Sequence, residues 1–380
     1  MNYLNASERA LNLIPGLEFK AEGYKEENIK STADSIVTPD FEFYKAAMVY
    51  VDSLCKPPGS LGKMEDFYGR LFSIFNGSIP EFKKCVVVFA GDNGVTDEGI
   101  SRNPVDTTQK ICMNILNGGS GLCKIGAYYN TDIFLEDIGV IRDIEGHTDH
   151  KVLYGTQNSV NGPAMSREEA AKCILSGMQV TEKLIESGYN LIGAGEMGVG
   201  NTTTSAAVLS ALTGAKPGVV TGYGSGISHE DLLNKIRVVG ESINNNQPFT
   251  DLLDLLRKIS GADILAMTGA YLKCAEKGIP FVLDGVISIA ALISATYFNK
   301  DVLSYAFPSH SSVEPGFKVA SEFLGLKPPI DMDMRLGEGS GCPIGMNIME
   351  LSIFTLSNMA KFEDVSVDKN DYIDIRRKEN

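Results

Sequence analysis

Residues 190–209 read NLIGAGEMGVGNTTTSAAVL, and this stretch decides the fold. It starts as a short apolar run, passes through four glycines and ends in small residues that suit a helix. The pattern predicts a buried strand, a tight loop and the first turn of a helix. Asn201 and Thr202 are placed to cap that helix or to donate to an anion. Glu196 is unexpected in a loop that favours anions, so we expect it to contact a hydroxyl or a cationic ring; the alternative is an ordinary turn with a solvated glutamate.

The same order of strand, glycine-bearing loop and helix recurs along the chain. Apolar runs that predict further strands lie at 85–90, 132–140, 280–283 and 302–307. Helical patterns lie at 40–54, 105–129 (with a break at Gly118 and Gly119), 167–187, 262–277, 287–297 and 346–361. This alternation predicts an α/β fold in which a mostly parallel sheet is flanked by helices. The loops after parallel strands gather along one edge, where ligands bind, so we expect six polar glycine loops to share one site.

Composition excludes several classes of function. The net charge of -14 argues against a nucleic-acid-binding surface. No apolar run has the length of a membrane span, and the N-terminus lacks the layout of a signal peptide, so we expect a cytoplasmic protein without a membrane partner. The seven cysteines are scattered without a CxxC pair, as expected for free thiols in a reducing compartment. The four histidines show no ligand spacing with them, so no metal site is predicted.

The loops contain acids, amides and hydroxyls but no familiar nucleotide motif. No Gly-Lys-Ser/Thr follows the glycines of the 190s, and no nucleophile elbow with a triad is present. Gly193, Gly195 and Gly198 spell GxGxxG, but no acid follows at the spacing that would hold a ribose, so a dehydrogenase is disfavoured. The remaining candidates for chemistry are Glu196, Glu338, Asp92, Asp284 and Lys235. Apolar walls around Glu338 would raise its pKa toward that of a useful general base.

Three other features have simpler interpretations. We interpret Lys56, beside a Pro-Pro-Gly turn, as a solvated lysine. His147 and His150 are expected in a surface loop rather than in a metal pair. Residues 1–35 are polar and weakly patterned, so we expect an N-terminal extension with one helix over 7–14.

Six motifs, in order, resemble those of the nicotinate-nucleotide:dimethylbenzimidazole phosphoribosyltransferases. They are KPPGSLGKME (56–65), GDNGVTDEGIS (91–101), GEMGVGNTTTSAA (195–207), LDGVISIAAL (283–292), SHSSVEPG (309–316) and MRLGEGSG (334–341). The resemblance spans about residues 40–362. It implies a Rossmann-like α/β domain over 81–342, a small helical domain built from 36–80 and 343–380, and a homodimer. The implied reaction joins nicotinate mononucleotide to 5,6-dimethylbenzimidazole without a cofactor, giving α-ribazole 5′-phosphate and nicotinate for cobalamin biosynthesis.

The resemblance also implies roles for individual residues. Glu338 corresponds to the general base, Glu196 to an acid that holds the ribose or its developing positive charge, and Lys235 to an active-site lysine. The residues implied to bind phosphate and ribose are Gly198, Gly200, Asn201, Thr202 and Ser312. The residues implied to line the pocket for the aromatic base are Ser101, Gln109 and Asp284.

Two positions depart from the family pattern and leave the acceptor open. Asn93 stands where the family usually has histidine, and Ser311 stands where many relatives have arginine. A purine or phenolic acceptor, with the chain as one subunit of an unlike pair, is therefore an alternative. A binding-only regulator is disfavoured because it would need no base such as Glu338, and a nicotinamide-cofactor oxidoreductase is the weakest alternative.

Overall fold

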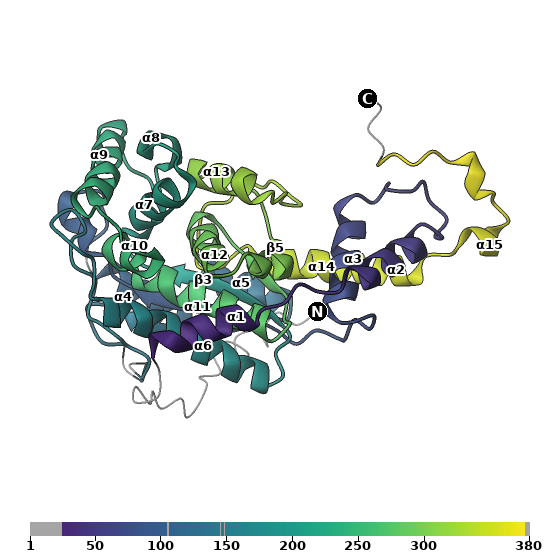
Figure 1. The fold of residues 1–380 in the computed structure, drawn as a ribbon, viewed down its shortest axis with the longest axis horizontal. Coiled ribbons are helices and arrows are strands. Elements are labelled where there is room, and N and C mark those ends of the chain that lie inside the picture. The colour runs from purple at the N-terminus through teal and green to yellow at the C-terminus, as the bar shows by residue number, and fades with distance from the viewer. Residues whose placement is uncertain (1–24, 105, 145, 148, 377–380) are drawn as a thin grey trace.

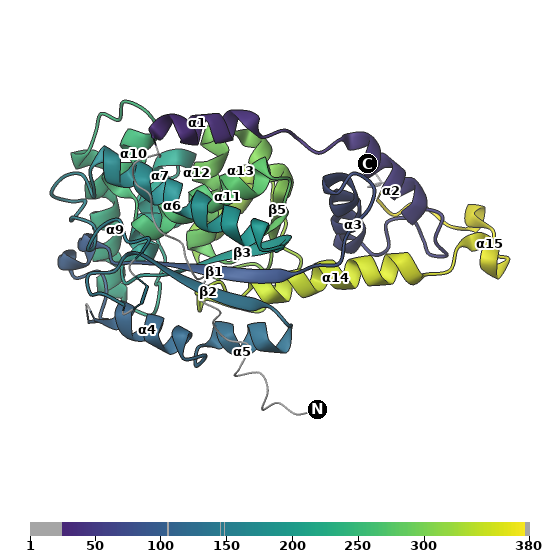
Figure 2. The ribbon, with the colours of Figure 1, turned by 90° about the horizontal axis from the view of Figure 1, so that it is seen from below.

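A five-stranded parallel sheet forms the centre of the protein (Figures 1 and 2). The computed structural model describes residues 25–376 with the exception of 105, 145 and 148. The sheet order is β2-β1-β3-β4-β5. The strands are β1 (Lys84–Gly91), β2 (Asp132–Gly139), β3 (Leu191–Met197), β4 (Phe281–Leu283) and β5 (Ala306–Pro308). The predicted α/β class with a parallel sheet is confirmed.

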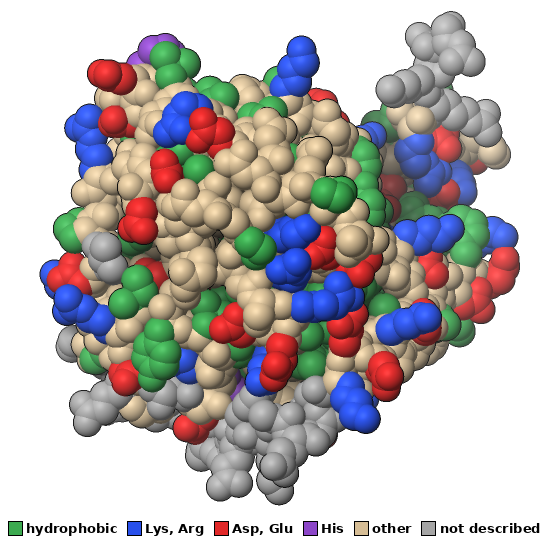
Figure 3. All heavy atoms as spheres, turned by 60° about the vertical axis from the view of Figure 1, so that its left-hand side comes forward, with side chains coloured by type: hydrophobic (Ala, Val, Ile, Leu, Met, Phe, Trp, Pro, Cys, Tyr) green, Lys and Arg blue, Asp and Glu red, His purple; other side chains and the backbone are tan. Residues whose placement is uncertain are grey.

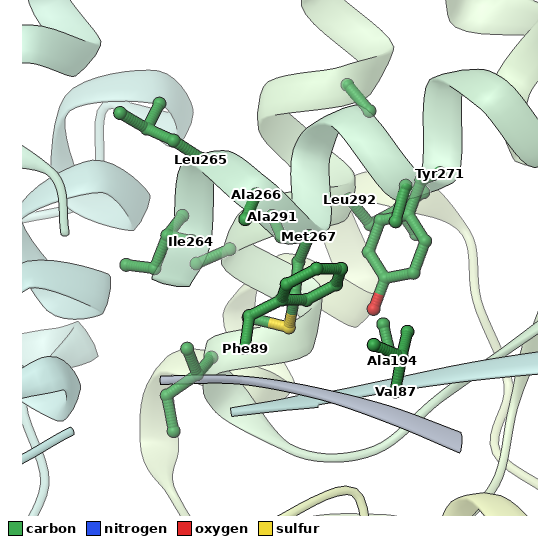
Figure 4. Close-up of a cluster of buried hydrophobic side chains, with 14 of the residues drawn as sticks. Val87, Phe89, Ala194, Ile264, Leu265, Ala266, Met267, Tyr271, Ala291 and Leu292 are labelled. Atoms are coloured by element: carbon green, nitrogen blue, oxygen red, sulfur yellow. The ribbon is translucent and has the colours of Figure 1, made fainter. Parts of the chain in front are cut away.

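The central strands are buried on both faces because helices cover both. Every residue of β1 is buried, which explains its unbroken run of apolar residues. Val87 of β1 lies between Phe134 of β2 and Ala194 of β3. Figure 4 shows Val87 and Ala194 beneath the ring of Tyr271, which lies on the covering helix α11 (Ala262–Glu276). The core therefore lies directly on the strands whose ends carry the glycine loops.

The helices form two layers around the sheet (Figure 2). One face is covered by α1 (Glu26–Ser35), α6 (Arg167–Glu186), α7 (Asn201–Thr213), α10 (Leu252–Ile259), α11 (Ala262–Glu276), α12 (Val286–Phe298) and α13 (Pro315–Leu324). The other face carries α4 (Thr107–Leu116), α5 (Gly121–Tyr128) and the start of α14 (Cys342–Asn358). The short α8 (Pro217–Val220) and the longer α9 (His229–Asn245) pack beside α7.

Helices α6 and α11 cross with their backbones in contact. A Cβ atom at Gly177 of α6 would lie 1.8 Å from the carbonyl oxygen of Ala266. A Cβ atom at Gly269 of α11 would lie 1.9 Å from the carbonyl oxygen of Ile174. Both glycines are therefore required by the close approach of the helices rather than by their own conformation.

Segments from the two ends of the chain pack together beside the sheet (Figure 1). Here α2 (Phe41–Val51) packs against α3 (Lys63–Ile74), and α3 packs against α14. The short α15 (Phe362–Val365) follows α14. A separate apolar cluster joins them, comprising Ala47, Val51, Leu54, Tyr68 and Leu356. The hydroxyl of Tyr50 donates to the carbonyl of Leu356 at 3.0 Å.

Several local predictions are corrected by the structure. Residues 302–307 were expected to be one strand, but Lys300–Tyr305 form a 3₁₀ helix (η4) before β5. The side chain of Asn299 caps this turn by accepting from Asp301 N at 2.8 Å. Val302 and Tyr305 both point into the core, and this three-residue spacing fits a 3₁₀ helix.

Two residues expected at the surface are buried. Lys56 is 7% exposed, and its Nζ lies 2.6 Å from Oε1 of the buried Glu65. His150 is also buried, with Nδ1 2.5 Å from Glu136 Oε2. Each buried side chain is paired with a glutamate that lies outside its own turn or loop, so the spacing of nearby residues did not reveal the pair.

The described part of the chain begins with a helix that packs on the main core. The helix expected over 7–14 lies outside the described residues. Helix α1, which was not predicted, contributes Ile29 and Ala33 to the main core. On the face shown in Figure 3, Lys and Arg side chains lie interspersed with Asp and Glu. Across the described residues, every helix is too short or too polar to cross a membrane.

Candidate active site

A cavity of about 330 Å³ lies where the sheet strands end. Its walls come from the loops after β3, β4 and β5, from the start of α7, and from the segment 335–340. In the sheet, β2 lies on one side of β1 and β3 lies on the other. The connections that follow β1 and β3 therefore run in opposite directions, and in parallel sheets such a point opens a crevice at the carboxyl ends of the strands. The proposed residues that line the cavity are Ser101, Glu196, Gly198, Gly200, Asn201, Thr202, Lys235, Asp284, Ser312 and Glu338. Gln109 and the candidate acid Asp92 are not among the residues that line the cavity.

The RLGEGSG segment adopts an unusual backbone conformation. Gly337, Glu338 and Gly339 have consecutive φ values of 84°, 62° and 83°, and a side chain at such values is strained. The segment lies directly on β3, because a Cβ atom at Gly195 would be 2.3 Å from the carbonyl oxygen of Glu338. The glycines therefore let this loop bring Glu338 against the strand end.

Glu338 combines burial with an unused hydrogen-bonding atom. The residue is 9% exposed and lines the cavity. Its Oε2 atom is buried and has no hydrogen-bond partner among the described residues. Burial raises the pKa of Glu338 above its usual range, while Ser120 and the backbone amide of Leu122 oppose the shift. A buried carboxylate with a free oxygen and a raised pKa is suited to accept a proton.

Glu196 belongs to a set of buried acids joined by Asn201. The Asn201 amide donates to Glu196 Oε2, and also to Asp263 Oδ2 at 3.1 Å. The backbone N–H of Glu338 donates to Glu196 Oε1 at 3.3 Å. Burial raises the pKa of Glu196 well above its usual range, and Asp263 and Asp284 raise it further. Burying these carboxyl groups together disfavours their negative charge, and a cation placed beside them would favour their ionised form and be stabilised in turn.

Asp284, at the end of β4, supports the RLGEGSG segment. It accepts from the backbone N–H of Gly339 at 3.2 Å and of Gly341 at 2.7 Å. Burial raises its pKa to about 7, although these two hydrogen bonds act in the opposite direction. Asp284 therefore holds the loop that carries Glu338 as well as lining the cavity.

Lys235 lies on α9, and its buried ammonium is beside the start of α7. It is 2% exposed, and its Nζ donates to Thr202 Oγ1 at 2.8 Å and to the Gly222 carbonyl at 3.2 Å. Burial lowers its pKa to about 8. Helix α7 begins at Asn201, so its first backbone N–H groups lie in the same region of the lining. An ammonium together with a helix N-terminus can bind a phosphate.

The departures from the family pattern occupy different environments. Asn93 is 2% exposed, and its amide donates to the Val199 carbonyl at 3.3 Å, which joins the loop after β1 to the loop after β3. Ser311 is partly buried, and its backbone N–H donates to Ile330 O at 2.8 Å. Neither residue lines the cavity. Asp92 is likewise buried and accepts from Thr108 Oγ1 at 2.5 Å.

The residues proposed for the aromatic base are only partly assembled. Ser101 lines the cavity, and its Oγ accepts from Asn103 N at 3.2 Å. Gln109 instead donates to the carbonyl of Asp143 at 2.7 Å. The neighbouring α4 residues Thr107 and Ile111 line the cavity in its place.

Several polar residues at or next to the site were not predicted from the sequence. Asp263 is fully buried at the start of α11, and burial raises its pKa to about 6. Glu314 and His310 line the cavity and are also buried. The polar motif SHSSVEPG at 309–316 was the signal for the last two, whereas Asp263 lies in the first turn of an ordinary helix and had none.

Comparison with known proteins agrees with this architecture. A family model described as "Phosphoribosyltransferase" matches residues 36–367. A Clostridium perfringens protein named nicotinate-nucleotide--dimethylbenzimidazole phosphoribosyltransferase is 41% identical over 333 residues, covering 87% of this chain and 92% of that protein. A Clostridium tetani protein of the same name is 39% identical over 355 residues, covering 92% and 98%.

A solved structure shows the same fold. The crystal structure of the protein given that name from Thermus thermophilus is similar with a TM-score of 0.82 and 34% sequence identity, covering 87% of this chain and 99% of that one. The match therefore extends over most of this chain and nearly all of the other. By sequence and by structure, this chain belongs to the nicotinate-nucleotide:dimethylbenzimidazole phosphoribosyltransferase family.

Proposed function

We propose that this protein transfers the phosphoribosyl group of nicotinate mononucleotide to 5,6-dimethylbenzimidazole in cobalamin biosynthesis. The products are α-ribazole 5′-phosphate and nicotinate. The observation that carries the proposal is one cavity lined by two complementary groups. These are Glu338, whose buried Oε2 has no partner among the described residues, and the buried cation Lys235. Membership of the family supports the same reaction.

The reaction needs one base and a fixed orientation. One nitrogen of the benzimidazole attacks C1′ of the ribose from the face opposite nicotinate, while Glu338 accepts the proton from the other nitrogen. The bond from C1′ to nicotinate breaks, and its electron pair neutralises the positive ring nitrogen. Attack from the opposite face inverts C1′ from β to α. Because nicotinate leaves with a neutral ring, positioning and electrostatics suffice, and we propose no cofactor.

The other proposed residues divide between the two substrates. Glu196 would stabilise the ribose and the positive charge that develops on it, because a cation beside the buried acid set favours the ionised form of its carboxyl group. Lys235 would bind the 5′-phosphate together with Gly198, Gly200, Asn201, Thr202 and Ser312. Ser101 and Asp284 would line the base pocket, and Gln109 would join them after releasing Asp143.

The organisation of the protein is part of the proposal. We divide it into an N-terminal extension (1–35), a small helical domain (36–80 with 343–380) and a catalytic α/β domain (81–342). We propose a cytoplasmic homodimer, with an unlike pair as the alternative. Sedimentation of the purified chain at several concentrations would measure twice the chain mass for the homodimer, whereas a monomer would contradict it.

A competition assay tests the reaction. Purified protein receives nicotinate mononucleotide with equal dimethylbenzimidazole, adenine and p-cresol, and products are resolved by mass. Dominant α-ribazole 5′-phosphate supports the proposed acceptor, whereas an adenine or cresol product moves the function to another cobamide. No nicotinate release with any of the three would refute phosphoribosyl transfer by this chain alone.

A further inference from the structure

Glu314 is a buried acid in an unexpected place. It is 9% exposed and lines the cavity beside the groups proposed to bind the phosphate. A carboxylate close to an anion site would weaken binding unless it had another task. Its hydrogen bonds and its neighbours indicate what that task is.

Glu314 holds the glycine loop at 222–226 by direct contact. The backbone N–H of Gly224 donates to Glu314 Oε1 at 2.8 Å. A Cβ atom at Gly222 would lie 2.1 Å from Glu314 Oε2. The loop backbone therefore lies against both carboxylate oxygens, and any side chain at 222 would displace the acid.

The other side of the same loop lies against the proposed phosphate-binding groups. The Gly222 carbonyl accepts from Lys235 Nζ at 3.2 Å. A Cβ atom at Gly224 would lie 2.9 Å from Thr202 Oγ1 and 3.2 Å from Lys235 Nζ. Gly224 has a φ of 56°, which favours glycine. The loop is thus held between Glu314 on one side and Lys235 with Thr202 on the other.

The charge of Glu314 also acts on Lys235. Burial lowers the pKa of Lys235 to about 8, and Glu314 is the charged group that raises it. Among the described residues, the ammonium donates hydrogen bonds to two neutral groups, the Thr202 hydroxyl from α7 and the Gly222 carbonyl from the loop. Asp231, one turn earlier on α9, is bound to Arg102 at 2.9 Å.

From these contacts we propose that Glu314 is a positioning residue for the donor's 5′-phosphate. It holds the 222–226 loop against Lys235 and Thr202, and its negative charge keeps Lys235 an ammonium. This inference rests on the proposed function, because it assigns Lys235 to the phosphate of nicotinate mononucleotide. It explains why an acid lies beside an anion site: the acid acts through the lysine and the loop.

Two substitutions separate charge from position. Glu314→Gln keeps an oxygen for Gly224 N but removes the charge, whereas Gly222→Ala keeps the charge but displaces the side chain. Glu314→Ala removes both. The matched control is Glu322→Gln, which neutralises an exposed glutamate on the nearby helix α13. Circular dichroism and thermal unfolding verify that each variant is folded.

Calorimetric titration with nicotinate mononucleotide, without acceptor, measures the effect independently of turnover. For Glu314→Gln we expect binding within twofold of wild type at pH 6.5. As the pH is raised, the variant should lose binding about one pH unit earlier than wild type does. Glu314→Ala and Gly222→Ala should bind about tenfold more weakly even at pH 6.5. Nicotinate riboside, which lacks the phosphate, should bind all variants and the control alike, and kcat of Glu314→Gln at saturating donor should stay within about threefold.

Several outcomes would overturn the inference. Equal weakening of nucleotide and riboside at every pH would make Glu314 a purely structural residue. If Glu314→Gln binds the nucleotide like wild type across the pH range, the charge of Glu314 does not keep Lys235 protonated. If the wild-type protein binds nucleotide and riboside with equal affinity, the phosphate makes no contribution to binding and the proposed phosphate site is wrong. A protein that prefers the nucleotide but makes no product would refute the proposed reaction, and the calorimetric comparison of variants would still decide the role of Glu314.

Discussion

At the scale of single residues, Glu338 pairs a strained backbone with a free carboxylate oxygen. Its φ of 62° places it where glycine is favoured, between two glycines with similar values. The contact with Gly195 and the hydrogen bonds from Gly339 and Gly341 to Asp284 hold the segment in this conformation. Such strain persists where the surrounding structure fixes it, as it does here.

The first prediction concerns Glu338→Gln. Glutamine has the same shape but cannot accept the proton, so we expect kcat to fall by about 10²–10⁴-fold. The affinity for nicotinate mononucleotide should change by less than about threefold, because Glu338 acts on the acceptor. Steady-state kinetics and calorimetry measure the two effects, with Glu322→Gln as the control. A wild-type rate in the Glu338 variant would remove it from the mechanism.

The second prediction concerns pH and Lys235. Its pKa is lowered to about 8, so the ammonium is lost as the pH rises through that value. We therefore expect kcat/KM for nicotinate mononucleotide to fall above pH 8. The same measurement with nicotinate riboside should show no such fall, because that donor has no phosphate for the ammonium to bind. Identical profiles for the two donors would contradict the assignment.

The residues differ in how well the sequence could identify them. Glu196 and Glu338 stand among glycines in the sequence, where an acid is conspicuous, and both line the cavity. Glu196 was expected in a loop but lies near the end of β3, whereas Glu338 lies in a loop. Asp263 lies in the first turn of an ordinary helix and is joined to Glu196 through Asn201, so its place at the site depends on tertiary packing. Lys56 could not be paired with Glu65 for a similar reason, since either residue alone fits an exposed surface.

At the scale of elements, close helix packing sets the third prediction. Gly177→Ala would place a methyl group against the carbonyl of Ala266 and force α6 away from α11. We expect a loss of about 1–3 kcal/mol of unfolding free energy. Gly240→Ala is the matched control, because its Cβ would lie 3.8 Å from Pro217 Cγ within a helix, and it should leave stability unchanged or raise it by about 0.5–1 kcal/mol. Equal stability of the two variants in denaturant unfolding would contradict this packing argument.

Elements with a strong pattern were predicted better than those fixed by context. The run CVVVFA predicted a strand at 85–90, and β1 spans Lys84–Gly91. The run at 302–307 was equally apolar but became a 3₁₀ helix and a short strand, because the Asn299 cap began a turn first. Short apolar runs satisfy more than one periodicity, so a local cap decides between them.

At the scale of the whole molecule, the buried acids make stability depend on pH. The pKa of Asp284 rises from 3.8 to about 7, and that of Asp263 rises from 3.8 to about 6. Because these values are raised in the folded state, their stabilising contribution is present below pH 4 and is lost as the pH rises through 6 to 7. Each unit is worth about 1.4 kcal/mol, so Asp284 contributes on the order of 4 kcal/mol across this window.

The fourth prediction follows from this sign. The ligand-free protein should unfold at a lower temperature at pH 8 than at pH 5. Asp284→Asn should reduce the difference between the two pH values, whatever its effect on absolute stability. The exposed Glu322→Gln should leave the difference unchanged. Thermal unfolding at both pH values measures it, and a wild-type protein that is more stable at pH 8 would contradict the prediction.

The packing of the two chain ends has a consequence for synthesis in the cell. Tyr50 and Leu356 are hydrogen-bonded across 306 residues, and a ribosome adds roughly 5–20 residues per second. Helices α2 and α3 therefore wait about 15–60 s for the segment that covers them. During that time their apolar side chains are open to other nascent chains. The first surface to leave the ribosome is the last to be covered, and a pause late in translation would prolong its exposure.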